Sequence, residues 1–275
     1  MLESLEQQRT AHWIGALALA LLPQVALAAP VWQINTEGTG LSGASTVSSV
    51  DVTGVGFVQI LPSTTVPYVF DFVEHGAYRA VKPDGLAALG THDLTLTYSV
   101  FGTGSFLDPA ALRFTSGTID IYADAALDFG TATANYGADN GTLIARLGIS
   151  EGGVDAAGLV TVKASAIQGT LRPGYFFTAD GSDLSTRNDV TMTLGVYNQT
   201  VTPDAMMISE VICSLAAYAG PGCNGEPYAN TPLSFAVQDG GYAFMSTVAE
   251  PGSLSMLLAG LGLVATVRRR RRAAH

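Results

Sequence analysis

The sequence predicts an all-β domain, either an antiparallel β-sandwich or a jelly-roll-like fold, with one short helix. Three observations favour this class. Apolar and polar residues alternate with period two in many segments, which is typical of half-buried strands. Asn-Gly and Asp-Gly dipeptides separate these segments, and no helical segments alternate with them, as parallel crossovers would require.

The alternation is clearest in residues 94–100, where Leu94, Leu96, Tyr98 and Val100 share one face. Further short strands are expected at residues 55–60, 66–73, 118–122, 143–149, 160–164, 190–194, 233–237 and 242–246. The dipeptides expected to turn the chain are Asp84-Gly85, Asn140-Gly141, Asp180-Gly181, Asn224-Gly225 and Asp239-Gly240.

The single helix is expected from Met207 to Ala219, where apolar residues follow helical spacing. Asp204 stands at the position of an N-cap, and Gly220-Pro221 ends the pattern.

The domain organisation follows from two apolar ends. Residues 1–28 read as a signal peptide, because an apolar run ends before Ala26-Leu27-Ala28, the small-x-small pattern that precedes cleavage after Ala28. Residues 29–248 form one extracellular domain, and residues 249–275 form a separate tail. In an exported chain, the isolated pair Cys213 and Cys223 favours a disulfide over half of a zinc site.

The charge of the domain excludes some partners. Residues 30–248 carry seven Lys and Arg side chains against twenty Asp and Glu. A surface of this kind repels the phosphate backbone of nucleic acid and anionic lipid headgroups, so no nucleic-acid partner is expected.

Residues suited to catalysis are few, and no enzyme activity or catalytic residue is predicted. His75 and His92 are the only histidines of the domain, and each is expected at the surface or at a strand end. Asp120, Asp124 and Asp128 recur every fourth residue. They are either solvated turn residues or ligands of a weak calcium site, so the expected cofactor is none or calcium.

The tail reads as a short membrane anchor. Leu254 to Val267 contains no charged residue, and as a helix it measures about 21 Å against a bilayer core of about 30 Å. The five arginines that follow would orient the segment with its end in the cytoplasm: Arg268, Arg269, Arg270, Arg271 and Arg272. Glu250-Pro251 would then lie just outside the membrane, within reach of a membrane-embedded processing enzyme.

These parts together resemble the PEP-CTERM sorting signal: Glu250-Pro251, Gly252-Ser253, the apolar helix and the arginine cluster, with Ala249 in place of the usual first proline. The resemblance implies cleavage by an exosortase-type enzyme near Glu250 and Pro251. It also implies a transient inner-membrane form and a final place at the surface or in the matrix of a Gram-negative bacterium.

A second resemblance concerns the domain. The segments that start at Trp32, Phe72 and Phe114 (WQINTEGTGLSGASTVSSVDVTGVGFVQI, FVEHGAYRAV and FTSGTIDIYAD) are similar to the flocculation-associated branch of PEP-CTERM proteins. This implies an exported protein, associated with exopolysaccharide, that promotes cell aggregation in flocs or biofilms. Two alternatives stay open: a polysaccharide-active enzyme of jelly-roll type that uses Asp120 and Asp124, and a calcium-dependent carbohydrate-binding module.

Overall fold

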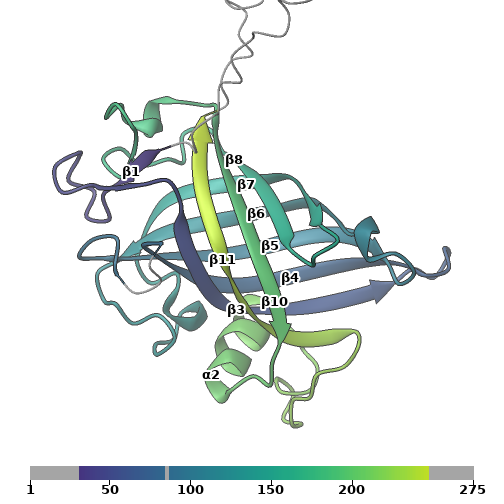
Figure 1. Ribbon diagram of the computed structural model, residues 1–275. Coiled ribbons are helices and arrows are strands. Elements are labelled where there is room, and N and C mark those ends of the chain that lie inside the picture. The colour runs from purple at the N-terminus through teal and green to yellow at the C-terminus, as the bar shows by residue number, and fades with distance from the viewer. Residues whose placement is uncertain (1–30, 84–86, 248–275) are drawn as a thin grey trace, which may run out of the picture. The chain divides into compact units, whose positions relative to one another are not determined.

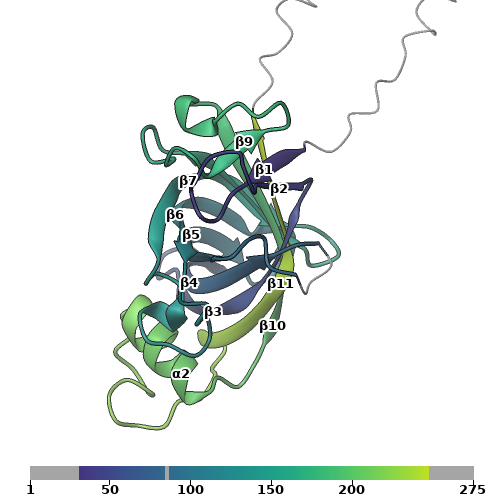
Figure 2. The ribbon, with the colours of Figure 1, turned by 90° about the vertical axis from the view of Figure 1, so that its left-hand side faces the viewer.

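In the computed structural model, which describes residues 31–83 and 87–247, antiparallel strands close into a barrel (Figures 1 and 2). The barrel order is β10-β11-β3-β4-β5-β6-β7-β8, and a small second sheet has the order β2-β1-β9. The barrel strands are β3 (Val50–Pro62), β4 (Val69–Val81), β5 (Asp93–Ser105), β6 (Arg113–Asp124), β7 (Thr142–Val154), β8 (Val160–Ala166), β10 (Val190–Thr200) and β11 (Ser234–Thr247). The small sheet contains β1 (Trp32–Ile34), β2 (Ser45–Val47) and β9 (Phe176–Thr178).

The predicted all-β antiparallel class with one short helical segment is confirmed, but the strands form a closed barrel where a sandwich or jelly roll was expected. Closure is made by β10, which pairs with β8 on one side and with β11 on the other. A closed sheet leaves no unpaired strand edge, so each backbone N–H and C=O along the ladder can find a partner.

The strands are longer than expected, and β11 shows why. It runs through two predicted strands and through the predicted turn at Asp239-Gly240. Asp239 is only 2 % exposed, because its side chain lies inside the barrel. An Asp-Gly pair is typical of a turn, but here the tertiary contacts of the carboxyl group keep the chain extended.

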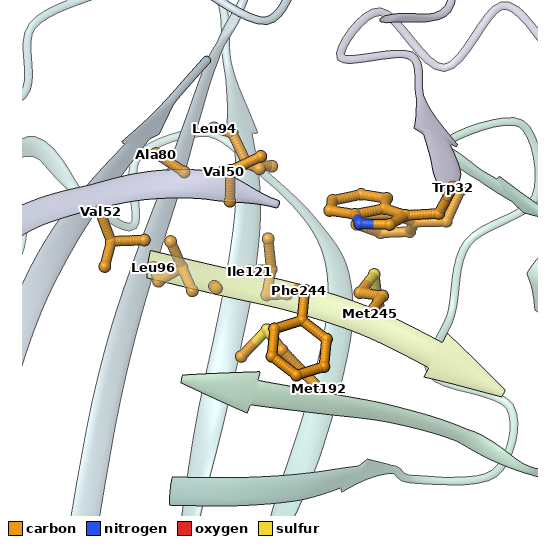
Figure 3. Close-up of a pocket in the computed structure, with 12 residues that line it drawn as sticks. Trp32, Val50, Val52, Ala80, Leu94, Leu96, Ile121, Met192, Phe244 and Met245 are labelled. Atoms are coloured by element: carbon orange, nitrogen blue, oxygen red, sulfur yellow. The ribbon is translucent and has the colours of Figure 1, made fainter. Parts of the chain in front are cut away.

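The upper half of the barrel interior is apolar. Trp32, from β1, lies over the barrel mouth above Met245, Ile121 and Leu96 (Figure 3). A cavity of about 20 Å³ remains below the indole, which leaves room for about one water. This end of the barrel is therefore filled with side chains and closed by the small sheet.

The helix packs on the outside of the barrel. A short α-helix, α2 (Ala205–Met207), continues as a π-helix, η4 (Ile208–Leu215). Asp204 caps the start as predicted, since its carboxylate accepts a hydrogen bond from the Met207 amide at 2.8 Å. Val211 and Ile212 pack on Phe57 of β3, which faces outward from the barrel. The helix ends at Leu215, four residues before the predicted end.

The predicted disulfide between Cys213 and Cys223 is present. It ties the end of η4 to the following loop, outside the barrel.

We expect the Cys213→Ser/Cys223→Ser variant to lose about 3 kcal/mol of unfolding free energy, because the loop is no longer closed in the unfolded chain. The strand signal in circular dichroism should be retained. Denaturant titration with and without reductant provides the control: reductant should destabilise the wild type and leave the variant unchanged.

Candidate functional site

A pair of aromatic rings lies on the outer face of β10 and β11. Tyr242 and Phe244 are two residues apart on β11, so both side chains leave the same face of the strand. Their rings are nearly parallel, with an interplanar angle of 11° and centroids 6.3 Å apart. Tyr242 is 37 % exposed.

The Tyr242 ring lies across the neighbouring strand because its partner there is a glycine. Tyr242 pairs with Gly195 of β10, and a Cβ atom on Gly195 would lie 2.6 Å from Cζ of the tyrosine. Any larger residue at position 195 would displace the ring. The ring of Phe244 is nearly parallel to it, and we call the two rings together the aromatic platform.

A polar groove lies on the same side of the barrel. It has a volume of about 390 Å³, and its lining residues are Arg113, Glu151, Gly152, Gly153, Val154, Asp155, Thr161 and Lys163. The ammonium of Lys163 pairs with the carboxylate of Glu151 at 2.5 Å, and both side chains are more than half exposed. Both charges therefore remain open to a ligand from solvent.

The strand register joins the groove to the platform. Thr161 of the groove pairs with Gly195, so it lies one strand spacing, about 5 Å, from the residue that the Tyr242 ring covers. β8, β10 and β11 lie side by side in Figure 1. Flat rings beside charged and hydroxyl groups can stack on the apolar face of a sugar and bond its hydroxyls. The strand at residues 242–246 was predicted from its alternation, but the platform was not; two aromatic residues at positions i and i+2 were the available signal.

A second polar site is buried inside the barrel. It consists of Glu74 and Tyr78 of β4, Tyr98 of β5 and Asp239 of β11. The Tyr78 hydroxyl donates to Asp239 Oδ2 at 2.8 Å, and the Tyr98 hydroxyl lies 2.9 Å from Glu74 Oε1 and 3.2 Å from Asp239 Oδ2. Gly76 makes room for this network, because a Cβ there would lie 2.3 Å from the Tyr98 hydroxyl oxygen.

The two buried carboxyl groups hold a proton at neutral pH. Burial raises the pKa of Glu74 to about 8, helped by the nearby Asp239 charge, while the hydrogen bond from Tyr98 opposes the rise. Burial also raises the pKa of Asp239 to about 6, against the hydrogen bonds from both tyrosines. The pair therefore keeps a proton that two solvent-exposed carboxyl groups would have lost at pH 7. A cavity of about 20 Å³ beside Glu74 has room for about one water and none for a sugar ring.

The calcium candidates do not come together. Asp120 forms an ion pair with Arg146 at 2.6 Å, and Asp124 accepts a hydrogen bond from the Ala126 amide. Asp128 accepts hydrogen bonds from the side chain of Asn140. Within residues 31–83 and 87–247, no group of three or more His, Cys, Asp or Glu side chains is placed to hold a metal ion.

The two histidines take different positions. His92 directly precedes β5, at a strand end as predicted, and its Nδ1 lies 3.0 Å from the Thr36 carbonyl oxygen. His75 does not lie at a strand end: it is in the middle of β4, with its side chain half-buried. Burial lowers the pKa of its imidazole. The register of β4 brings it beside β3 and β5 rather than to an end.

The pH dependence of stability provides a test of the buried network. Because the folded state favours protonated Glu74, we expect the unfolding free energy to fall by a few kcal/mol, roughly, as pH rises from about 4.5 to about 8. Glu74→Gln mimics the protonated group, so this variant should show a smaller fall and exceed the wild type in stability at pH 8. Asp71→Asn, which changes an exposed carboxylate of the same strand, is the matched control. Equal pH slopes for wild type and Glu74→Gln would contradict the assignment.

The predicted processing and membrane-orienting residues lie outside the described part of the chain: Ala28, Glu250, Pro251, Arg268, Arg269, Arg270, Arg271 and Arg272. No helix within the described ranges is long and apolar enough to cross a membrane.

A comparison with known protein families identifies a motif at the C-terminal end of the chain. The family model described as the PEP-CTERM protein-sorting motif matches residues 247–272, a range that takes in Glu250-Pro251 and the five arginines. The comparisons with curated proteins and with solved structures each give no match. The match begins at Thr247, the last residue of β11. By this motif, the chain is a PEP-CTERM protein, exported and held transiently in the membrane before processing by an exosortase-type enzyme.

Proposed function

We propose that this PEP-CTERM protein is a matrix protein of a Gram-negative bacterium that binds exopolysaccharide through its barrel and promotes cell aggregation in flocs or biofilms. The observation that carries the proposal is the sorting motif that starts where β11 ends, because it makes the barrel the exported, working part of the chain. The similarity of the domain to the flocculation-associated branch supports the same function.

The aromatic platform and the polar groove support a polysaccharide ligand. A sugar chain presents flat apolar ring faces and hydroxyl edges in repeating order, and the platform and groove offer a complementary surface for each. The groove carries charges of both signs, since Lys163 lies beside Glu151. It therefore does not select for a polymer of one charge.

We propose binding rather than catalysis. The two acids of the enzymatic alternative are Asp120 and Asp124. They are four residues apart on one strand, so their Cα atoms are about 13 Å apart. This exceeds the separation between the two carboxyl groups of glycoside hydrolases. Asp120 is also held by Arg146. The closer pair, Glu74 and Asp239, is buried beside a cavity of about 20 Å³, too small for a sugar.

The sorting step has a direct test. Deletion of residues 249–275 should leave secretion intact and abolish retention at the cell surface or in the matrix, because the motif is lost and the signal peptide is kept. Deletion of residues 273–275 alone, beyond the arginines, is the matched control and should retain the protein. Cell fractionation and intact mass measure both outcomes. Restored floc formation by the longer deletion would contradict the sorting role.

The sugar-binding face has its own test. Tyr242→Ala removes one ring of the platform, and we expect about tenfold weaker binding to exopolysaccharide isolated from the producing cells. Tyr68→Ala, at another exposed tyrosine, should bind as the wild type does. Co-sedimentation at several polymer concentrations gives the affinities, and a chelator added to the same assay tests the calcium-dependent alternative. Release of reducing ends from the polymer would favour the enzyme instead.

A further inference from the structure

Oxygen atoms from three strands meet inside the lower half of the barrel. The hydroxyl oxygens of Tyr78 and Tyr98 are 3.3 Å apart. The Tyr98 hydroxyl also lies 2.9 Å from Glu74 Oε1 and 3.2 Å from Asp239 Oδ2, and all four side chains are more than nine-tenths buried. β4, β5 and β11 therefore direct two carboxyl groups and two hydroxyl groups toward one place.

Asn198 of β10 adds a further oxygen at the same place. It pairs with Asp239 in the strand register, so the two side chains leave the same face of the sheet, with Cβ atoms about 5 Å apart. Asn198 also lines the cavity of about 20 Å³ beside Glu74. It is exposed to solvent, so it marks the route by which a small ion can reach the cavity. We call these five residues the oxygen cluster: Glu74, Tyr78, Tyr98, Asn198 and Asp239.

One oxygen of the cluster lacks a partner. Asp239 Oδ1 is buried and has no hydrogen-bond partner within residues 31–83 and 87–247, although the Asp239 side chain is only 2 % exposed. A buried carboxylate oxygen without a partner destabilises the fold. Because such an oxygen only accepts, it can be satisfied by a hydrogen-bond donor or by a cation. The adjoining cavity has room for about one water, so the partner is small: one water molecule or one ion.

The lining of the cavity favours a cation. Its polar side chains each carry an oxygen atom, and the other described residues of the lining are apolar, with no Lys, Arg or His among them. Carboxylate and amide oxygens are the ligands that calcium prefers in proteins. Residues 30–248 carry twenty acidic side chains against seven basic ones, and a domain of this charge attracts cations. Two carboxylates also balance the charge of one divalent ion.

We propose that the oxygen cluster binds one calcium ion inside the barrel, through the carboxylates of Glu74 and Asp239 and the amide oxygen of Asn198. The site is separate from the surface carboxylates expected from the sequence, which do not come together. A calcium ion here connects β4 with β10 and β11, the pair of strands at which the barrel closes, and it stabilises the closed barrel because it binds only the folded chain. The site uses neither the aromatic platform nor the polar groove, so it stands independently of sugar binding.

The test uses the processed protein purified from the producing cells, freed of metal with a chelator and titrated with calcium chloride in a calorimeter. We expect one calcium ion per chain with a dissociation constant of about 0.1–1 mM, the range of extracellular calcium modules. Glu74→Gln removes one ligand charge and should bind at least about tenfold more weakly. Asp71→Asn, at an exposed carboxylate of the same strand, is the matched control and should bind as the wild type does. Circular dichroism confirms that the variants are folded.

Two results would overturn the proposal: no binding by the wild type up to about 10 mM calcium, above the range of extracellular sites, or equal affinities in the wild type and Glu74→Gln. Binding that Glu74→Gln retains and Asp128→Asn loses would assign the ion to a surface loop and would also overturn it. Asn198→Ala, at the exposed end of the cluster, should weaken binding too, and it decides the question if Glu74→Gln does not fold. Tyr242→Ala should bind calcium normally, which separates this test from that of the sugar-binding face.

Discussion

The closure of the barrel through β10 is the constraint on which the other features depend. Once β10 pairs with both β8 and β11, alternate residues of every strand are fixed as interior or exterior. This assignment places Asp239 inside, against two tyrosines, and Tyr242 outside, over Gly195. A one-residue shift of β11 would exchange these environments and expose the carboxyl site while burying the platform.

The buried carboxyl groups set the register more than they add stability. Removing Glu74 and Asp239 from water costs free energy, which the hydrogen bonds from Tyr78 and Tyr98 offset only in one strand alignment. Interiors filled by apolar residues alone tolerate shifts and repacking more readily. We interpret the network as the element that specifies how β4, β5 and β11 align, with Gly76 as the residue that leaves space for it.

Local patterns predicted the local features. Alternation located most strands, Asp204 and the apolar spacing located the start of the helix, and the cysteine spacing located the disulfide. The order of parts in the tail predicted the sorting motif. The missed features depend on residues far apart in the sequence: barrel closure, the interior position of Asp239, and the ring of Tyr242 over Gly195. The helix ends before Ala219 because Ala217 adopts a left-handed φ of 50°, which the apolar spacing does not reveal.

The position of Trp32 over the barrel mouth also constrains the order in which the chain folds. Trp32 comes from the first described strand, yet it closes a cavity lined by Met245 from the last one (Figure 3). β3 pairs with β11 in the same way, across almost the whole domain. Contacts of such high sequence separation form late and slowly. A chain that crosses a membrane from its N-terminus therefore cannot complete this barrel until β11 has emerged, and β11 is the segment that leads directly into the sorting motif.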